Sequence, residues 1–259
     1  MKICNHEISP YVDFFVDSDG VLTKVINMSG DACELTIPKT LHQGEDTIEI
    51  KAIGSHCFSG RFSRVTIDDE IEVVYGRAFC SASVDTVVWS KGCKAIPTHC
   101  FDNCRLKRIY NIEDVTEIRE YAFCMSSIAQ FDWPAGCTKI PDRCFGNSCL
   151  KKISGIENVI QIGCSAFSFC SISAFNWPSG CDIIPENCFF CSNLRDINNI
   201  DKVVKIGNNA FSYCKLDFVD MSNMSAVHIG ACSFSGISPD NVVLPYYYPE
   251  DDYNLIFSE

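Results

Sequence analysis

Cysteine is the residue type with the greatest capacity for chemistry in this chain, which contains 18 cysteines among 259 residues. Three groups recur: Cys93, Cys100 and Cys104; Cys137, Cys144 and Cys149; Cys181, Cys188 and Cys191. A structural zinc site needs four convergent ligands, usually with paired Cys-x2-4-Cys spacing. Within these groups the spacings are seven and then three to five, and only His99 adds a histidine. We therefore expect no metal and no cofactor, and interpret the thiols as small apolar side chains of the core.

Disulfides between equivalent cysteines are disfavoured by distance if the chain forms stacked turns. Adjacent parallel strands lie roughly 4.8 Å apart, so cysteines two turns apart are separated by roughly 9–10 Å. This exceeds the limit of about 7 Å between the Cα atoms of a disulfide. A disulfide within one turn remains an alternative, and so does a redox-responsive or metal-responsive role.

Nucleophilic catalysis would require a cysteine and a histidine that face each other. His56 precedes Cys57 and His99 precedes Cys100, but neighbouring residues on a helix diverge by about 100°. The five histidines share no repeated position, and the chain has no P-loop, Gly-x-Gly-x-x-Gly or Gly-x-Ser-x-Gly motif. We expect no catalytic residues and no enzymatic activity.

The elements that would position these residues follow from an internal repeat. An Ile-x-x-x-x-Phe motif recurs with steps of 21, then six times 22, then 23 residues. Its phenylalanines are Phe58, Phe79, Phe101, Phe123, Phe145, Phe167, Phe189, Phe211 and Phe234. This regularity predicts about nine stacked turns whose phenylalanines form one core column.

A second part of each turn alternates between constantly apolar and variable positions. Val87, Ile109, Phe131, Ile153, Phe175, Ile197 and Val219 hold the apolar position. Their neighbours vary freely from turn to turn, as expected for the two faces of a β-strand. We therefore predict one short strand in each turn, and a parallel sheet formed by the strands of stacked turns.

The segment around each phenylalanine is expected to be a short helix. Ile162, Ala166 and Cys170 follow i, i+4 and i+8 spacing, which places them on one helical face. A second period of 44 residues overlies the first. The residue before the phenylalanine alternates between Ala and Cys, and another position alternates between Asn or Gly and Trp, the tryptophans being Trp89, Trp133 and Trp177. Large beside small residues fill stacked layers without voids, and we expect the tryptophans to be partly buried at the sheet edge.

Composition and charge limit the partners. The net charge is −12, with 33 acidic and 21 basic residues, which argues against nucleic acid and anionic membranes as the main partner. No apolar run approaches the ~20 residues needed to span a bilayer. The first residues lack the apolar segment of a secretion signal, so we expect a cytoplasmic protein, or a surface or secreted one if a leader was removed.

The repeat resembles a known family. Ile162–Cys170 and Ile206–Cys214 are similar to turns of the BspA-like, treponemal-type leucine-rich repeat, and the resemblance covers about residues 51–236. It implies an α/β, right-handed leucine-rich-repeat solenoid of nine turns of about 22 residues, with a parallel concave sheet and short helical segments. Residues 1–50 are expected to form an N-terminal β cap, with two strands around an Asp/Gly turn, and residues 237–259 a C-terminal cap. Members of the family often serve in adhesion or protein binding on microbial cells.

The variable outward positions are the candidate binding residues, because the inner face of a solenoid sheet is a common recognition surface. The candidates are Arg108, Tyr110, Gln130, Asp132, Lys152, Asn176, Asp196, Phe218 and Asp220. We expect a non-enzymatic module that binds a protein, or alternatively a glycan, on this surface. The alternative is a structural or targeting subunit that docks through its caps and through Tyr246, Tyr247, Tyr248 and Tyr253.

Overall fold

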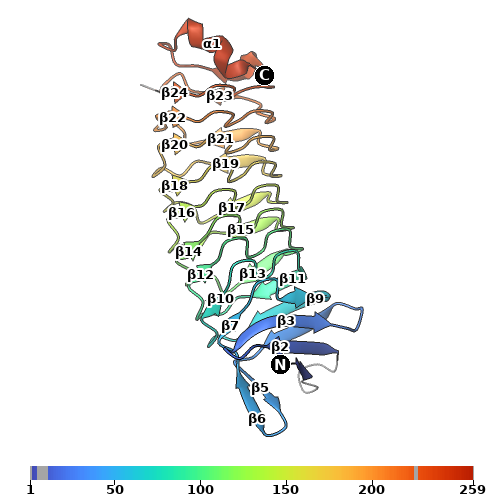
Figure 1. Cartoon of the computed structure of the whole chain (residues 1–259). Helices are drawn as coiled ribbons and strands as arrows, with labels where there is room; N and C mark the ends of the chain where they lie inside the picture. The colour runs from blue at the N-terminus through green and yellow to red at the C-terminus, as the bar shows by residue number, and fades with distance from the viewer. Residues whose placement is uncertain (1, 5–10, 225–226, 259) are drawn as a thin grey trace. The chain divides into compact units, whose positions relative to one another are not determined.

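A computed structural model describes residues 2–4, 11–224 and 227–258, which fall into two compact units, 1–128 and 129–259. Both units consist of short strands joined by turns (Figure 1). The strands of the first unit are β1 (Lys2–Cys4), β2 (Val12–Val16), β3 (Val21–Asn27), β4 (Cys33–Ile37), β5 (Thr40–Gln43), β6 (Asp46–Glu49), β7 (Ala52–Ile53), β8 (Phe58–Ser59), β9 (Arg61–Ile67), β10 (Val73–Val74), β11 (Ser83–Val88), β12 (Ala95–Ile96), β13 (Arg108–Tyr110) and β14 (Glu117–Ile118).

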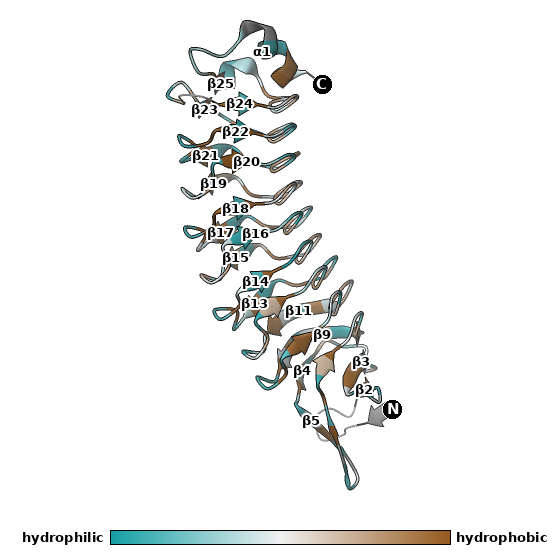
Figure 2. Ribbon diagram, turned by 60° about the vertical axis from the view of Figure 1, so that its left-hand side comes forward, coloured by the Kyte–Doolittle hydropathy of each residue, from teal (hydrophilic) through white to brown (hydrophobic). Residues whose placement is uncertain are grey.

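The second unit has eleven strands, one turn of 3-10 helix and one α-helix among its described residues. They are β15 (Gln130–Asp132), β16 (Lys139–Ile140), β17 (Lys152–Ser154), β18 (Gln161–Ile162), β19 (Ala174–Asn176), β20 (Ile183–Ile184), β21 (Asp196–Asn198), β22 (Lys205–Ile206), β23 (Val219–Asp220), β24 (His228–Ile229), η1 (Pro239–Asn241), β25 (Val242–Val243) and α1 (Glu250–Phe257). Within this unit the turns lie one above another (Figures 1 and 2).

The phenylalanine column forms the core, as the repeat predicted. Phe58 is 8% exposed and the other eight phenylalanines are 0% exposed. Successive rings stack: the centroids of Phe145 and Phe167 are 6.0 Å apart, and those of Phe189 and Phe211 are 5.8 Å apart, with nearly parallel planes. Because each ring is covered by the turns on both sides, burial makes short, individually unstable turns hold together.

Each turn contributes to two parallel ladders, one more than the sequence predicted. The first ladder consists of β4, β9, β11 and β13 in the first unit, and the pairs β15–β17, β19–β21 and β23–β25 in the second. It contains the strands predicted for the repeat and also β4 and β25, which lie in the regions predicted as caps. The second ladder consists of two-residue strands that end on the isoleucine column, such as β16–β18 and β20–β22–β24. These strands are too short to produce a visible period of two.

The short helical segments predicted around the phenylalanines are absent from the described turns, and that prediction was wrong. Two residues in each of these segments have a positive φ, at positions two before and two after the phenylalanine; around Phe189 they are Asn187 (55°) and Cys191 (55°). The backbone N–H of Asn187 and Phe189 donates to the following turn, at Asn208 O (3.0 Å) and Ala210 O (2.9 Å). The N–H groups that alternate with them, such as those of Cys188 and Phe190, bond within their own turn, at Pro185 O and Asn187 O. A helix would keep all of these bonds local, so the stacking of turns overrides the helical spacing.

The first ladder of the second unit is divided into pairs rather than continuous. β15 pairs with β17 and β19 with β21, whereas β17 and β19 belong to different sheets. The backbone N–H of Trp177 donates to Asn198 O (2.8 Å), and Asn199, which follows β21, has a φ of 63°. Paired and unpaired junctions between strands therefore alternate from turn to turn, which gives the 44-residue period a structural basis.

The tryptophans are more deeply buried than predicted. Trp89, Trp133 and Trp177 are 0%, 4% and 2% exposed, so partial burial at the sheet edge was wrong. Each indole Nε1 donates to the carbonyl of the cysteine four residues later, which satisfies its only polar group inside the core.

Both ends of the repeat meet other elements of the same unit. β2 and β3 form the expected antiparallel hairpin around Asp17–Gly20, and β3 also pairs with β7 of the first turn. Residues 1 and 5–10 of the predicted N-terminal cap lie outside the described residues. At the other end, Leu255 O and Ile256 O of α1 accept the N–H groups of Cys232 and Phe234. Terminal carbonyls of a helix lack partners within it, so here they complete the hydrogen bonding of the last turn.

Candidate functional site

The variable columns point to the solvent, as predicted. All nine candidate residues are exposed: Arg108, Tyr110, Gln130, Asp132, Lys152, Asn176, Asp196, Phe218 and Asp220. The apolar residues between them, such as Phe131, Phe175 and Ile197, are buried. Packing therefore fixes the inward residues and leaves the outward ones unconstrained.

In the first unit the outward face of the first ladder centres on Tyr110. Its ring centroid lies 5.8 Å from the guanidinium carbon of Arg64, within the range of a cation–π contact. Arg64 aligns with Thr86, which in turn aligns with Arg108, so these residues form one outward row. We did not identify Arg64 from the sequence, although it precedes Arg108 by two repeats of 22 residues.

The same face has a shallow hollow of about 330 Å³ on β4 and β9, lined by Glu34, Leu35, Thr36, Arg64 and Thr66. Glu34 and Thr36 belong to the region predicted as a cap, yet β4 pairs with β9 in parallel and extends the outward surface. A charged pair of opposite sign and two hydroxyls line this hollow, which is suited to polar contacts with a partner.

In the second unit the outward side chains bond to each other along the ladder. Ser154 Oγ donates to a carboxylate oxygen of Asp132, and Asn198 Nδ2 donates to Asn176 Oδ1 over 3.2 Å. Hydrogen bonds from the side chain and backbone N–H of Ser222 lower the pKa of Asp220, which keeps this exposed carboxylate charged. Phe218 is 53% exposed beside these polar groups.

A hollow of about 470 Å³ lies where β17 and β19 are not paired. Lys152 and Asn176 line it, as do Lys151, Ser154, Glu157 and Ser173. The structure thus brings two of the predicted residues into one recess, with two ammonium groups and a carboxylate around it. Gln130 and Asp132 lie on the neighbouring strand β15, while Asp196, Phe218 and Asp220 lie farther along the same unit.

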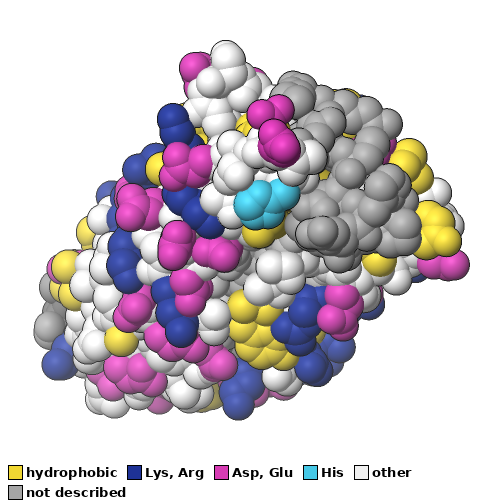
Figure 3. Space-filling view, turned by 90° about the horizontal axis from the view of Figure 1, so that it is seen from below, with side chains coloured by type: hydrophobic (Ala, Val, Ile, Leu, Met, Phe, Trp, Pro, Cys, Tyr) yellow, Lys and Arg dark blue, Asp and Glu magenta, His cyan; other side chains and the backbone are white. Residues whose placement is uncertain are grey.

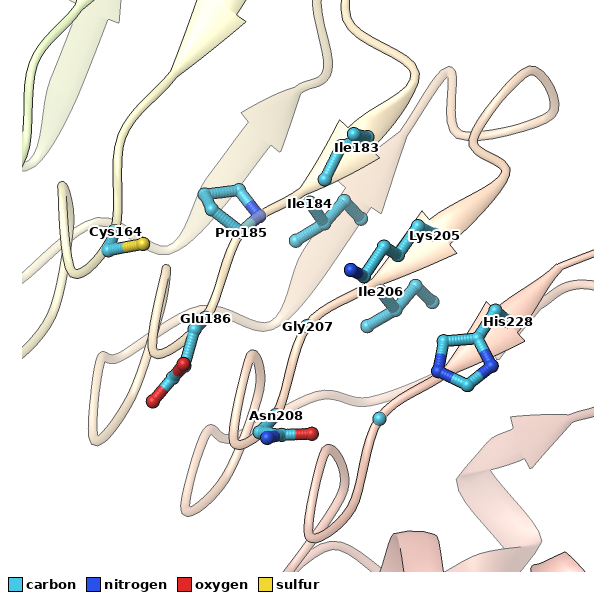
Figure 4. Close-up of a pocket in the computed structure, with 11 residues that line it drawn as sticks. Cys164, Ile183, Ile184, Pro185, Glu186, Lys205, Ile206, Gly207, Asn208 and His228 are labelled. Atoms are coloured by element: carbon cyan, nitrogen blue, oxygen red, sulfur yellow. The ribbon is translucent and has the colours of Figure 1, made fainter.

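A further recess lies on the second ladder of this unit and was not predicted. It has a volume of about 470 Å³ and is lined by residues of β20, β22 and β24 and of the turns that follow these strands and β18 (Figure 4). Lys205 and His228 project from the strands, while Glu186, Asn208 and Cys164 lie on the turns. Burial and the negative charges of Asp142 and Glu186 raise the pKa of Cys164, so its thiol stays protonated at neutral pH and is a poor nucleophile.

The cysteines of the core have the same inert character. Burial raises the pKa of Cys104 and Cys214 to about 12 and that of Cys93 and Cys181 to about 11. Their sulfurs lie within hydrogen-bond distance of backbone carbonyls, such as Cys214 Sγ and Phe189 O at 2.9 Å. The described cysteines carry thiols rather than disulfides, and among described residues no three His, Cys, Asp or Glu side chains are placed to hold a metal ion.

His99, which precedes Cys100 in the chain, contacts Asp102 and Tyr121. His99 Nδ1 lies 2.7 Å from Asp102 Oδ2, and the His99 ring stacks on Tyr121 with centroids 4.4 Å apart. Cys100, the adjacent thiol, is 0% exposed. This arrangement holds a surface turn in place and does not assemble a cysteine–histidine nucleophile.

Acidic and basic side chains are interspersed on the face that Figure 3 shows. Within the part of the chain that the structure describes, no helix is both long enough and apolar enough to cross a membrane.

Known proteins share this architecture. A crystal structure of a leucine-rich repeat protein from Bacteroides ovatus superposes with a TM-score of 0.76 at 18% identity, over 91% of this chain and 66% of that one. The chain thus spans about two thirds of the length of that protein, and the likeness shows the fold.

Two other structures align with lower scores. One is a leucine rich cell surface protein from Faecalibacterium prausnitzii, with a TM-score of 0.44, 15% identity and coverage of 100% of this chain and 98% of that one. The other is the pneumococcal vaccine antigen PcpA, with a TM-score of 0.47, 12% identity and coverage of 92% and 79%. No curated protein sequence matches the chain.

The family assignment comes from the sequence model of the BspA type leucine rich repeat region, which matches residues 40–148 and 116–239 and has six copies in the chain. Together these two ranges cover most of the protein, and they include the nine phenylalanine turns and all strands of the two ladders except β4 and β25. The chain belongs to the family of BspA-type leucine-rich-repeat proteins.

Proposed function

We propose that the chain is a non-enzymatic interaction module that binds a protein partner on the outward face of the first ladder. One observation carries the proposal: the inward positions of this ladder keep apolar residues, whereas Lys152, Ala174 and Asp196 occupy equivalent exposed positions with unrelated chemistry. Neither packing nor solubility requires such variety. A partner that lies across several strands would use it for specificity.

The hollow between β17 and β19 is the proposed centre of this binding surface. Central positions that exclude water contribute most to binding, whereas charges at the rim contribute little. Lys152 and Asn176 border the hollow, so a partner side chain inserted there would contact both. Arg108 and Tyr110, supported by Arg64, form the corresponding surface of the first unit.

Site-specific crosslinking tests this proposal and captures the partner in the same experiment. A photoreactive amino acid is placed at Lys152 or at Asn176, and as a matched control at Lys139, which is exposed on β16 of the second ladder. Lysate from the source organism is then irradiated with each protein. We expect one and the same partner to crosslink from the first two positions and not from Lys139. Equal crosslinking from all three positions would contradict the proposal.

A quantitative arm follows once the partner is identified. Replacing Lys152, Asn176 and Asp196 by Ala should weaken its binding by about tenfold or more, equal to about 1.4 kcal/mol. Thermal stability should stay nearly unchanged because all three side chains are exposed. A control variant in which Lys139 and Lys205 are replaced should bind normally.

The C-terminal region favours a second candidate function, docking of another chain. Tyr246 is fully exposed, at 103%, and a cleft of about 360 Å³ beside it is lined by Leu244, Pro245, Tyr248, Pro249 and Tyr253. Deleting the tail would be a poor test, because Ile256 is buried and α1 completes the last turn. Tyr246→Ala and Tyr253→Ala are better variants, and loss of the partner in these alone would favour docking through the tail.

We also infer that the protein works where thiols stay reduced, as in the cytoplasm. The support is that Cys149 and Cys164 are exposed free thiols, which an oxidising compartment would not preserve. A surface or secreted location is the alternative, and fractionation of the source cells distinguishes the two.

A further inference from the structure

Three aromatic residues form a surface cluster on the tips of the turns in the second unit, away from both ladders. Phe169, Phe190 and Tyr213, here called the aromatic tip, come from three successive turns. Phe169 and Phe190 have ring centroids 5.4 Å apart, and those of Phe190 and Tyr213 are 6.0 Å apart, both in edge-to-face geometry. Phe169 is 53% exposed and Tyr213 is 49% exposed, so the cluster is only partly covered by its own chain.

The backbone under the two outer rings is in an unfavourable conformation for such residues. Phe169 has a φ of 56° and Tyr213 a φ of 58°. The left-handed region costs a residue with a side chain roughly 1–2 kcal/mol, and Asn or Gly are tolerated best. The same position is occupied by Asn103 and Asn147 in other turns, with φ of 53° and 57°, and by Gly236. Stability therefore favours Asn or Gly at these two positions, and burial does not account for the aromatic rings.

Hydrogen bonds between turns hold the tip in place. The backbone N–H of Phe169 donates to Phe190 O over 2.8 Å, and that of Tyr213 donates to Ser235 O over 2.7 Å. The Tyr213 ring extends over Gly236, where an added Cβ would lie 2.7 Å from the ring carbon Cδ1. The rings are thus presented on an ordered backbone, which lowers the entropy lost when a ligand binds.

The residues directly before and after the three aromatic rings in the chain carry no charge. The chain neighbours of the three rings are Ser168, Cys170, Phe189, Cys191, Ser212 and Cys214, without Asp, Glu, Lys or Arg. The backbone N–H of Asn147 donates to Ser168 O and that of Asn193 to Cys170 O, so both exposed residues lie beside the tip, as does half-exposed Ser171. Lys215, which occupies the position of Asn193 in the next turn, is exposed and charged. A surface on which most adjoining side chains are uncharged matches a neutral ligand better than a highly charged one.

The size of the tip limits the kind of ligand. A whole aromatic side chain presents about 150–250 Å², so three partly exposed rings offer on the order of 300 Å². A stable protein interface needs about 800 Å² from each partner. The aromatic tip is therefore too small to hold a second copy of this chain by itself, and is of a size for a few units of a chain-like molecule.

From these observations we propose that the aromatic tip binds a neutral glycan. The C–H groups of a sugar ring carry partial positive charge and pack on the negative face of an aromatic ring. The hydroxyl groups of the same sugar can bond to amide and hydroxyl side chains, which Asn147, Ser171 and Asn193 provide. This site is separate from the ladder surface proposed for the protein partner, so each proposal can fail without the other.

Affinity electrophoresis of the full chain tests the proposal with defined probes. Gels contain a soluble β-glucan, an α-glucan or a galactomannan, and the shift in mobility gives the dissociation constant for each. The test variant replaces Phe169 and Tyr213 by Asn, the residue that already occupies this left-handed position at 103 and 147. Met125→Asn, at the equivalent exposed position of another turn, is the matched control. The single variant Tyr213→Asn serves if the double variant proves unstable.

We expect at least one neutral polysaccharide to retard the wild-type protein. The double variant should lose affinity by about tenfold or more, with a melting temperature unchanged or higher, and Met125→Asn should bind like the wild type. The proposal is overturned if none of the three polysaccharides retards the wild type, or if the double variant binds equally well. It is also overturned if sedimentation shows a dimer that the double variant converts to monomers, because the tip would then be a self-interface.

Discussion

The indole Nε1 of Trp133 donates a hydrogen bond to the carbonyl oxygen of Cys137 over 2.8 Å, in a core where both residues are less than 5% exposed. The same relationship joins Trp89 to Cys93 and Trp177 to Cys181. A buried polar group without a partner is costly, so this bond allows the chain to place a large indole inside every second turn. The alternating column of tryptophans thus depends on backbone geometry four residues away.

Trp133→Phe should lower the free energy of unfolding by about 1–3 kcal/mol, because it leaves the buried Cys137 carbonyl without its donor and removes part of the ring volume. Urea denaturation followed by far-ultraviolet circular dichroism measures the change. Lys139→Ala, an exposed substitution in the same turn, is the control and should change stability by less than about 0.5 kcal/mol. Equal effects of the two variants would mean that the indole bond contributes nothing.

Phe145→Ala should cost roughly 3–5 kcal/mol, the range for truncating a buried aromatic side chain. Phe145 is 0% exposed, and its ring contacts those of Phe131, Trp133 and Phe167. Phe169→Ala is the matched control, since Phe169 is 53% exposed and belongs to the aromatic tip. A loss below about 1 kcal/mol for Phe145→Ala would show that the column is not the core.

The spacing of Phe145 and its equivalents was sufficient to predict the turn length and the core column, and the alternation around Phe131 and its equivalents predicted the strand of the first ladder. Burial determines these features, and burial acts on residue type, which the sequence displays directly. The outward direction of Lys152 and Asn176 followed from the same alternation. That Lys152 and Asn176 line the same hollow could not be predicted, because the hollow depends on the missing pairing between β17 and β19.

The conformation around the phenylalanines could not be predicted from spacing alone. Ile162, Ala166 and Cys170 fit a helix, but their turn is built from two left-handed residues, Ser165 and Phe169, and from hydrogen bonds to the next turn. Asn at 103, 147, 187 and 209 and Gly at 60 and 236 were the available signal. These residue types favour positive φ, and their recurrence two positions from the phenylalanine pointed away from a helix.

Arg77→Gly distinguishes the left-handed turn conformation from a helix by the sign of its effect on the free energy of unfolding. Arg77 has a φ of 64° and is exposed. Glycine adopts this conformation without steric cost, so the variant should be more stable by about 0.5–1 kcal/mol after the greater entropy of its unfolded chain is included. In a helix the same change would destabilise the protein by a similar amount. Chemical denaturation of the variant and of Arg77→Asn, which should also be stabilising, measures the sign.

Stability at alkaline pH should follow from the buried thiols. Burial raises the pKa of Cys214 and Cys104 from an ordinary value of 9.0 to about 12, and that of Cys93 and Cys181 to about 11. Between these values the unfolded chain loses thiol protons that the folded chain keeps, so the unfolded state binds fewer protons and the free energy of unfolding falls as pH rises. The contribution of these thiols should be complete below pH 9 and should be lost progressively from pH 9 to about 12.

Urea denaturation at pH 7, 9 and 10.5 measures this fall, and two cysteine variants assign it. Cys214→Ala is less stable at neutral pH because it leaves a cavity, but its further loss between pH 9 and 10.5 should be smaller than that of the wild type by the share of one thiol. Cys149→Ala is the control, because Cys149 is exposed, and its pH dependence should match the wild type. If the free energy of unfolding stays constant over this range, these cysteines are not buried as thiols, and disulfides within the turns become the better explanation.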